Sequence, residues 1–238
     1  MTTATDHPVR PASARGRLVV RTVGEVLLTL GVLLLLFVFY QLVWTNVTAD
    51  RAAAAATRQL EATWHGGSAE VVPGEEYPGG IHAGRPFAFL YLPRLGRDWR
   101  EPVIQGVSLD DLAKGVGHYP TSALPGEVGN FAVAGHRATH GQPFAYLDRM
   151  RAGDVAVVET ATTWYVYRLQ ASFLVQPTDV DVVAPVPGHP AQRPTQRLIT
   201  LTTCNPRWAS YQRMIIHGTL VAQRAKTQGP PPELAGRS

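Results

Sequence analysis

An uninterrupted apolar segment near the amino terminus limits what this chain can fold into. Residues 26–44 read VLLTLGVLLLLFVFYQLVW and contain no charged side chain. About 20 apolar residues are needed to cross a hydrocarbon core roughly 30 Å thick. The sequence therefore predicts a single transmembrane helix, with the anchor taken as residues 23–44. Tyr40 and Trp44 suit the far membrane interface, where aromatic side chains gather.

The charges before this segment predict its orientation. The first 21 residues carry four arginines against one aspartate, and basic flanks stay in the cytoplasm. Residues 1–22 are therefore expected to be cytoplasmic, in a single-pass protein of the cell membrane whose bulk lies outside the cytoplasm. A cleaved signal peptide is the alternative, because residues 52–56 are all alanine. The apolar core of a signal peptide is about 7–15 residues long, which is shorter than this segment.

The segments that flank the main domain have compositions of their own. Residues 45–85 are expected to form a stalk and flexible linker, helical at first and then rich in Gly and Pro, with six Gly and two Pro in residues 65–85. The tail, residues 223–238, has too little apolar content to join a core and is expected to be disordered.

Residues 86–222 show the pattern of an all-β domain. Short apolar runs alternate with turn signals, and residues 163–169 alternate with a period of two. Seven or eight such strands are typical of a closed barrel or sandwich, and we predict a single β-barrel. Brief helices are expected after Ser108, as N-cap with Asp111 at N3, and around residues 144–150. The expected strands are 87–92, 102–107, 130–134, 154–159, 163–169, 197–203 and 214–221.

Charge, cysteine content and missing motifs exclude several functions. Residues 86–221 hold 12 Lys and Arg against 10 Asp and Glu, without the basic excess of a nucleic-acid-binding domain. A single cysteine rules out an intramolecular disulfide and a CxxC metal site. The chain contains no HExxH, GxxxxGK[ST] or GxSxG motif, which argues against zinc, phosphate and nucleotide chemistry. No metal or cofactor is expected.

The single cysteine lies where a strand should end. Cys204 follows the strand formers of residues 197–203, and Pro206 cannot continue a ladder. Arg213 opens the next expected strand, so two adjacent antiparallel strands would bring Cys204 and Arg213 to the same end of the barrel. A buried, inert thiol and a surface arginine are the alternatives for residues of these types.

A cysteine nucleophile needs a partner that handles protons. Of the eight histidines, His136 ends an apolar strand after Gly135, which permits close backbone approach. His140 is the second candidate. A free thiol has a pKa of about 8.5, so a cysteine nucleophile must lose its proton to react. An imidazole can protonate a leaving amine. A guanidinium can donate several hydrogen bonds to a developing oxyanion.

Two segments carry a resemblance to a known family. TLTTC, residues 200–204, resembles the sortase signature TLxTC, and Arg213 falls where the sortase arginine follows the cysteine. HYPTSALPGEVGNFAVAGHR, residues 118–137, resembles the sortase region that ends in the catalytic histidine. The order His, Cys, Arg agrees as well, and the combination is most similar to class E sortases of actinobacteria.

The resemblance implies a fold and an activity. Sortases have an eight-stranded β-barrel and cleave a carboxy-terminal sorting signal between Thr and Gly through a thioacyl-enzyme, which an amine of a cell-wall precursor of the lipid II type resolves. Class E enzymes favour LAxTG-like signals over LPxTG. The resemblance further implies that Cys204, His136 and Arg213 are catalytic, that Thr203 lines the substrate groove, and that Tyr119 contacts the signal. The partners would be surface proteins that carry such a signal.

Two other functions fit parts of the pattern. A cell-wall cysteine peptidase would share the nucleophile, although several such enzymes place Cys before His in the chain. A tethered β-barrel that binds wall polymer or a pilin would leave Cys204 inert.

Overall fold

The computed structural model describes residues 14–65 and 75–235, and the chain forms two compact units, Met1–Trp44 and Thr45–Ser238. The first unit is helical, with α1 (Ala14–Phe39) followed by a π-helical turn, η1 (Tyr40–Trp44). Within the described ranges one helical segment, Gly16–Trp64, is long and apolar enough to cross a membrane by length and composition. Most of the expected cytoplasmic segment, residues 1–13, lies outside the described residues.

The second unit is built on short β-strands, as the alternation of apolar runs and turns predicts. Seven of the strands described here correspond to expected ones, whereas β3 and β7, of three residues each, have no counterpart in the prediction. The strands are β1 (Pro86–Tyr91), β2 (Arg100–Gln105), β3 (Val116–His118), β4 (Gly129–Ala134), β5 (Val155–Glu159), β6 (Thr163–Leu169), β7 (Phe173–Val175), β8 (Arg197–Asn205) and β9 (Gln212–Ala225).

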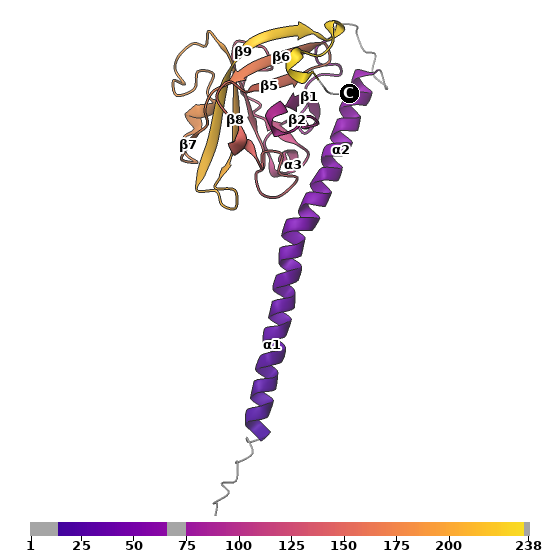
Figure 1. Ribbon diagram of the computed structural model, residues 1–238, viewed down its shortest axis with the longest axis vertical. Coiled ribbons are helices and arrows are strands. Elements are labelled where there is room, and N and C mark those ends of the chain that lie inside the picture. The colour runs from indigo at the N-terminus through magenta and orange to yellow at the C-terminus, as the bar shows by residue number, and fades with distance from the viewer. Residues whose placement is uncertain (1–13, 66–74, 236–238) are drawn as a thin grey trace, which may run out of the picture. The chain divides into compact units, whose positions relative to one another are not determined.

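Eight of these strands close into a barrel. The strand order is β6-β5-β1-β2-β3-β4-β8-β9-β7, and an additional antiparallel pairing of β6 with β9 joins the two sides of the sheet. Strand β7 is attached to the first half of β9, outside the ring. Figure 1 shows β5, β6 and β9 side by side at the closure. The predicted closed eight-stranded barrel is confirmed.

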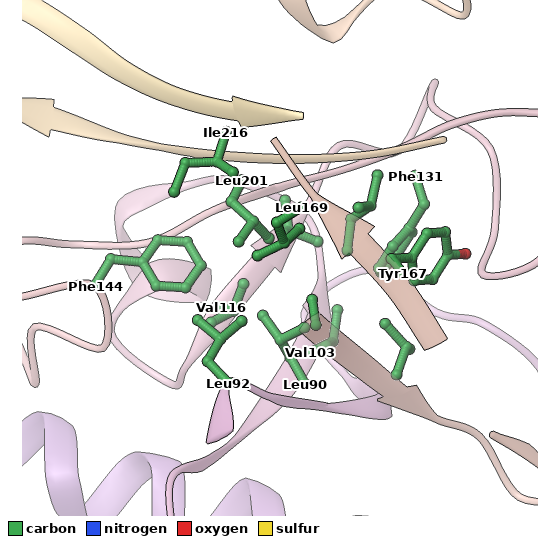
Figure 2. Packing of buried hydrophobic residues seen from close by; sticks show 14 of the residues in the cluster. Leu90, Leu92, Val103, Val116, Phe131, Phe144, Tyr167, Leu169, Leu201 and Ile216 are labelled. Carbon is green, nitrogen blue, oxygen red and sulfur yellow. The ribbon is translucent and has the colours of Figure 1, made fainter. Parts of the chain in front are cut away.

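The barrel interior is filled by alternate side chains of the strands. Figure 2 shows Leu201 and Ile216 from β8 and β9 pointing at Leu90 and Val103 from the opposite wall. Phe144, from the loop after β4, closes one end of this cluster. The residues of each strand that lie in the core define its inner face. The residues that alternate with them point outward.

Short helices lie at the two places where the sequence predicts them. Helix α3 (Leu109–Leu112) begins at Ser108, whose hydroxyl accepts a hydrogen bond from the backbone N–H of Asp111 in a capping box. A single 3₁₀ turn, η3 (Leu147–Arg149), lies within the second predicted region. Other 3₁₀ turns are η2 (Pro93–Leu95), η4 (Val180–Val183), η5 (Lys226–Gln228) and η6 (Pro232–Leu234).

The segment expected to be a free stalk is part of the folded unit. Helix α2 (Thr45–Trp64) packs on the outer face of the barrel, where Leu60 is 2% exposed and the ring of Trp64 meets that of Phe89 edge to face. An ion pair of 2.6 Å joins Glu61 to Arg100 on β2. The expectation of a spacer is wrong for α2, because its apolar face finds a matching face of the sheet.

The tail and the end of the linker also depart from the prediction. Strand β9 continues to Ala225, and Leu234 is 4% exposed in the cluster that contains Leu60, so the tail is ordered as far as residue 235. Before the barrel, Glu76 accepts hydrogen bonds from three threonines and from Tyr165. Composition does not predict these contacts, because each depends on a single residue: Leu234 attaches the tail, and Glu76 attaches the end of the linker. Residues 66–74 of the linker and 236–238 of the tail lie outside the described residues.

Candidate active site

Strand β8 presents Cys204 at the end of the barrel. Its residues Ile199 and Leu201 lie in the core, so Thr202 and Cys204 project from the outer face by strict alternation. Cys204 is a partly exposed free thiol and the next-to-last residue of the strand. A sulfur in this position is held by a rigid strand and is still accessible, so the thiol is not a buried one.

Arg213 lies directly opposite Cys204 in the antiparallel ladder of β8 and β9. Residues paired in this way project from the same face of the sheet, so both side chains are on the outer face. Nη1 of Arg213 donates hydrogen bonds to the carbonyl oxygens of Ser210 (3.1 Å) and Gln212 (3.0 Å). A guanidinium carries five N–H donors, and within the described part of the chain these bonds use Nη1 alone.

His136 reaches the same edge from the other side of β8. Strands β4 and β8 run parallel, with Ala134 in register with Thr202. His136 lies two residues after Ala134, and Cys204 lies two residues after Thr202. His136 and Cys204 therefore stand at the same distance along their two neighbouring parallel strands. The strand order β4-β8-β9 therefore places Cys204 between His136 and Arg213.

The backbone before His136 is fixed by packing and hydrogen bonds. The N–H of Gly135 donates to the carbonyl oxygen of Thr202 at 3.1 Å, and the carbonyl oxygen of His136 accepts from the N–H of Phe144 at 3.0 Å. A Cβ on Gly135 would lie 2.6 Å from the ring of Phe144. The close approach inferred from Gly135 in the sequence is therefore used to seat the ring of Phe144 against the backbone of Gly135.

The surroundings of His136 favour its neutral form. Burial lowers the pKa of His136, and the positive charge of protonated His140 lowers it further. The two rings are 5.3 Å apart between centroids. His140, the second histidine considered from the sequence, is thus a neighbour that tunes His136 electrostatically. An imidazole that is neutral near pH 7 can accept a proton from a thiol.

Tyr119 faces the same cluster of groups. Burial raises the pKa of its phenol, the positive charge of Arg213 opposes this shift, and a negative charge at Cys204 would add to it. The phenol thus lies within electrostatic range of both side chains. The contact of Tyr119 with a sorting signal that the resemblance implies stays a prediction.

Thr203 is not where the resemblance implies. Its side chain is 4% exposed and alternates to the inner face with Leu201, and its hydroxyl donates to the carbonyl oxygen of Gly135 at 2.7 Å. A side chain in this position cannot line a groove on the face that carries Cys204. The correction is that Thr203 holds the backbone that leads into His136.

Arg137 and Asn205 lie in or next to the motifs quoted above, and the sequence alone indicates no role for either residue. Arg137 is 7% exposed and donates to the carbonyl oxygen of Cys204 and to the side chain of Asn205. The signal in the sequence is adjacency alone, since each residue directly follows a candidate catalytic residue.

Two further histidines lie on strands of the barrel, His118 on β3 and His217 on β9, and are occupied by other contacts. His118 is buried between the rings of Phe87 and Phe131, and burial lowers its pKa to about 4. His217 has a ring nitrogen 3.1 Å from the carbonyl oxygen of Val182. Among the described residues no three His, Cys, Asp or Glu side chains come together as a set of metal ligands.

This arrangement suits acyl transfer. A thiol supplies a nucleophile, a neutral imidazole accepts its proton, and a fixed guanidinium can stabilise negative charge on a carbonyl oxygen. The three groups belong to adjacent strands or to their ends, which is the rigid placement that such chemistry requires.

Comparisons with known proteins identify a family. The family model described as "Sortase domain" matches residues 90–221. Sortase SrtE1 of Streptomyces coelicolor is 41% identical over 222 residues, 90% of this chain and 60% of that protein, so the chain spans less than two thirds of this relative. Sortase SrtE2 of the same organism is 36% identical over 232 residues, 90% of this chain and 88% of that protein.

A solved structure gives the same result. The crystal structure of sortase E1 from Streptomyces coelicolor with a tripeptide in the active site superposes with a TM-score of 0.59 at 37% identity. The match covers 66% of this chain and 100% of that one.

Proposed function

This chain belongs to the sortase family and is most similar to its class E members, and on that premise we propose that it is a membrane-anchored cysteine transpeptidase. Cys204 is the nucleophile, His136 the acid and base, and Arg213 the stabiliser of the oxyanion. The observation that carries this assignment is the register of β4, β8 and β9, which sets Cys204 between the other two.

The reaction has two acyl-transfer steps. His136 accepts the proton of Cys204, and the thiolate attacks the carbonyl carbon of the scissile peptide bond while Arg213 donates hydrogen bonds to the developing oxyanion. His136 then protonates the leaving amine, the C–N bond breaks, and a thioester remains on Cys204. An incoming amine attacks this thioester as His136 takes its proton, and the new amide leaves as the thiol is regenerated.

The substrate is a surface protein that carries a carboxy-terminal sorting signal of the LAxTG or LPxTG type, cleaved between Thr and Gly. The signal lies along the outer face of β8, next to Tyr119, whose half-buried phenol contacts it. The tripeptide in the active site of sortase E1 from Streptomyces coelicolor supports a peptide substrate for this chain. The acceptor is an amine of a lipid II-type peptidoglycan precursor.

The cell membrane is the proposed location. The helix that includes residues 23–44 crosses the bilayer, the basic residues before it stay in the cytoplasm, and the barrel lies outside. This topology brings the catalytic unit close to lipid-linked wall precursors and to translocated substrates.

The test is acyl-enzyme formation by the full chain in detergent. Incubation with an LAxTG peptide, with and without a triglycine acceptor, is expected to give a thioester on Cys204 by intact mass and an amide product when the acceptor is present. Cys204→Ala abolishes both. Absence of any acylation of the wild-type chain would favour a binding module, and cleavage at another bond would favour a peptidase.

A second test concerns the guanidinium. Arg213→Ala should lower turnover by about 10²–10³-fold, the usual effect of removing one donor to an oxyanion, while the melting temperature stays close to that of the wild type. Arg168→Ala is the matched control, since Arg168 is an exposed arginine on strand β6. Near-wild-type turnover of Arg213→Ala would remove Arg213 from the mechanism.

A further inference from the structure

A second row of polar side chains runs beside the proposed catalytic residues. Arg137 directly follows His136, Asn205 directly follows Cys204, and Gln212 directly precedes Arg213. We propose that these three side chains form a hydrogen-bonded clamp that positions the catalytic residues relative to one another. The inference rests on the proposed function, since it assigns positioning residues to the same site.

The ladder of β8 and β9 brings the clamp together. Asn205 pairs with Gln212 one step beyond the pair of Cys204 and Arg213. Asn205 alternates to the same face as Leu201, which points into the barrel. The clamp therefore lies at the inner rim of the barrel, on the other face of the sheet from Cys204 and Arg213, and does not obstruct the substrate.

Arg137 makes the shortest contact of the clamp. Its Nη1 donates to Oδ1 of Asn205 at 2.6 Å and to the carbonyl oxygen of Cys204 at 3.3 Å. Its Nη2 forms an ion pair of 3.1 Å with Asp148. One side chain thus ties the segment that carries His136 to the backbone of the nucleophile.

The clamp continues to the strand of Arg213. Nδ2 of Asn205 donates to Oε1 of Gln212 at 3.3 Å. The three side chains therefore link the end of β4, the end of β8 and the start of β9, the same three segments that carry His136, Cys204 and Arg213.

The burial of Arg137 is not expected to stabilise the fold. A guanidinium removed from water is favourable only when its charge and donors are compensated. The partner carboxylate of Asp148 is half exposed, and Nε of Arg137 is buried with no hydrogen-bond partner in the described part of the chain. The burial of Arg137 leaves its Nε without a partner, which costs free energy. We explain this burial by the hydrogen bond that Nη1 of Arg137 donates to the backbone of Cys204.

The consequence for catalysis is geometric. The carbonyl of Cys204 and the backbone before Arg137 determine the direction from which Sγ and the imidazole approach each other. A displacement of 1 Å at a reacting centre can lower a rate by about 10²-fold. Loss of the clamp should therefore act on kcat more than on KM, because the substrate binds on the opposite face.

The experiment compares Arg137→Met, Arg137→Lys and wild type in the full chain in detergent. For a sorting-signal peptide, Arg137→Met should lower kcat by about 10²-fold with KM within about twofold. Arg137→Lys should recover part of this loss only, since lysine supplies a point charge without the fork of donors. Arg151→Met is the control, because Arg151 is an exposed arginine a few residues beyond Asp148, and it should leave kcat unchanged.

A matched pair at Asn205 covers the case in which Arg137→Met fails to fold. Asn205→Asp keeps an acceptor for Arg137, and the amide of Gln212 can turn its Nε2 to donate to the new carboxylate, so this variant should retain most of kcat. Asn205→Leu removes both contacts and should lower kcat as Arg137→Met does. Equal kcat in the folded Asp and Leu variants would overturn the clamp, as would a lower melting temperature in Arg137→Met with unchanged kcat.

Alkylation of Cys204 by iodoacetamide separates this inference from the proposed function. The pH profile of the alkylation rate should differ between Arg137→Met and wild type, because the pairing of the thiol with the imidazole changes, and no sorting peptide is required. A changed profile in a chain that shows no transpeptidation would support the clamp and reject the proposed function. An unchanged profile in Arg137→Met would reject the clamp.

Discussion

Glu101 allows a quantitative prediction on how pH affects the stability of the folded unit that contains the barrel. The residue pairs with Leu90 on β1, whose side chain lies in the core. Burial raises the pKa of Glu101 from its ordinary value of 4.5 to about 7, and the negative charge of Asp50 on α2 adds to this shift. Because the folded state binds this proton more tightly, the protein should lose stability as the pH rises from about 4.5 to about 7.

The magnitude follows from the two pKa values. A change from 4.5 to about 7 corresponds to about 3 kcal/mol of unfolding free energy at pH 8, at about 1.4 kcal/mol per tenfold change. Glu101→Gln removes the charge and should stabilise unit 45–238 by up to this amount at pH 8 and by almost nothing at pH 4.5. For a domain of this size the melting temperature at pH 8 would rise by about 6–12 °C.

The assay is thermal and urea unfolding of residues 45–238, followed by tryptophan fluorescence at pH 4.5, 6 and 8. Glu233→Gln, at an exposed carboxylate of the tail, is the control and should change nothing at any pH. A stabilisation by Glu101→Gln that is the same at all three pH values would refute the reasoning, because it would show that charge is not its origin. No stabilisation at pH 8 would refute it as well.

Two further predictions concern the histidine and the helix. Since protonated His140 lowers the pKa of His136, His140→Ala should move the acidic limb of the kcat/KM profile to higher pH, and an unmoved limb would show that the limb does not report His136. Leu60→Ala should lower the unfolding free energy by about 2–5 kcal/mol because the side chain is buried, measured by urea unfolding. Leu109→Ala, with Leu109 77% exposed, should stay within about 0.5 kcal/mol of wild type, and equal effects of the two variants would contradict the docking of α2.

The strands and the capped helix could be predicted because their signals are local. A period of two in residues 163–169 and the pair Ser108 and Asp111 each specify a structure within a few residues. Strands β3 and β7 carry no such signal. With three residues each they are strands only because β2, β4 and β9 offer hydrogen-bond partners.

The candidate site divides in the same way. The position of Cys204 at a strand end and its pairing with Arg213 follow from a strand, a loop with Pro206 and a second strand. The placement of Thr203 on the inner face could not be predicted, because the sequence does not show which face of β8 meets the core. A shift of one residue in this assignment moves every side chain of the strand to the opposite face.

By itself the sequence determined the apolar helix, the all-β character of the main domain, and the residue types able to perform acyl transfer, because composition, periodicity and short motifs act over neighbouring residues. Only the tertiary structure decided that α2 and the tail pack on the barrel, that β4 runs parallel to β8, and that Arg137 reaches the backbone of Cys204. These features join residues from 25 positions apart along the chain, as for Trp64 and Phe89, to about 170 apart, as for Leu60 and Leu234. They depend on complementary surfaces that exist only after the barrel has closed, and no local pattern specifies them.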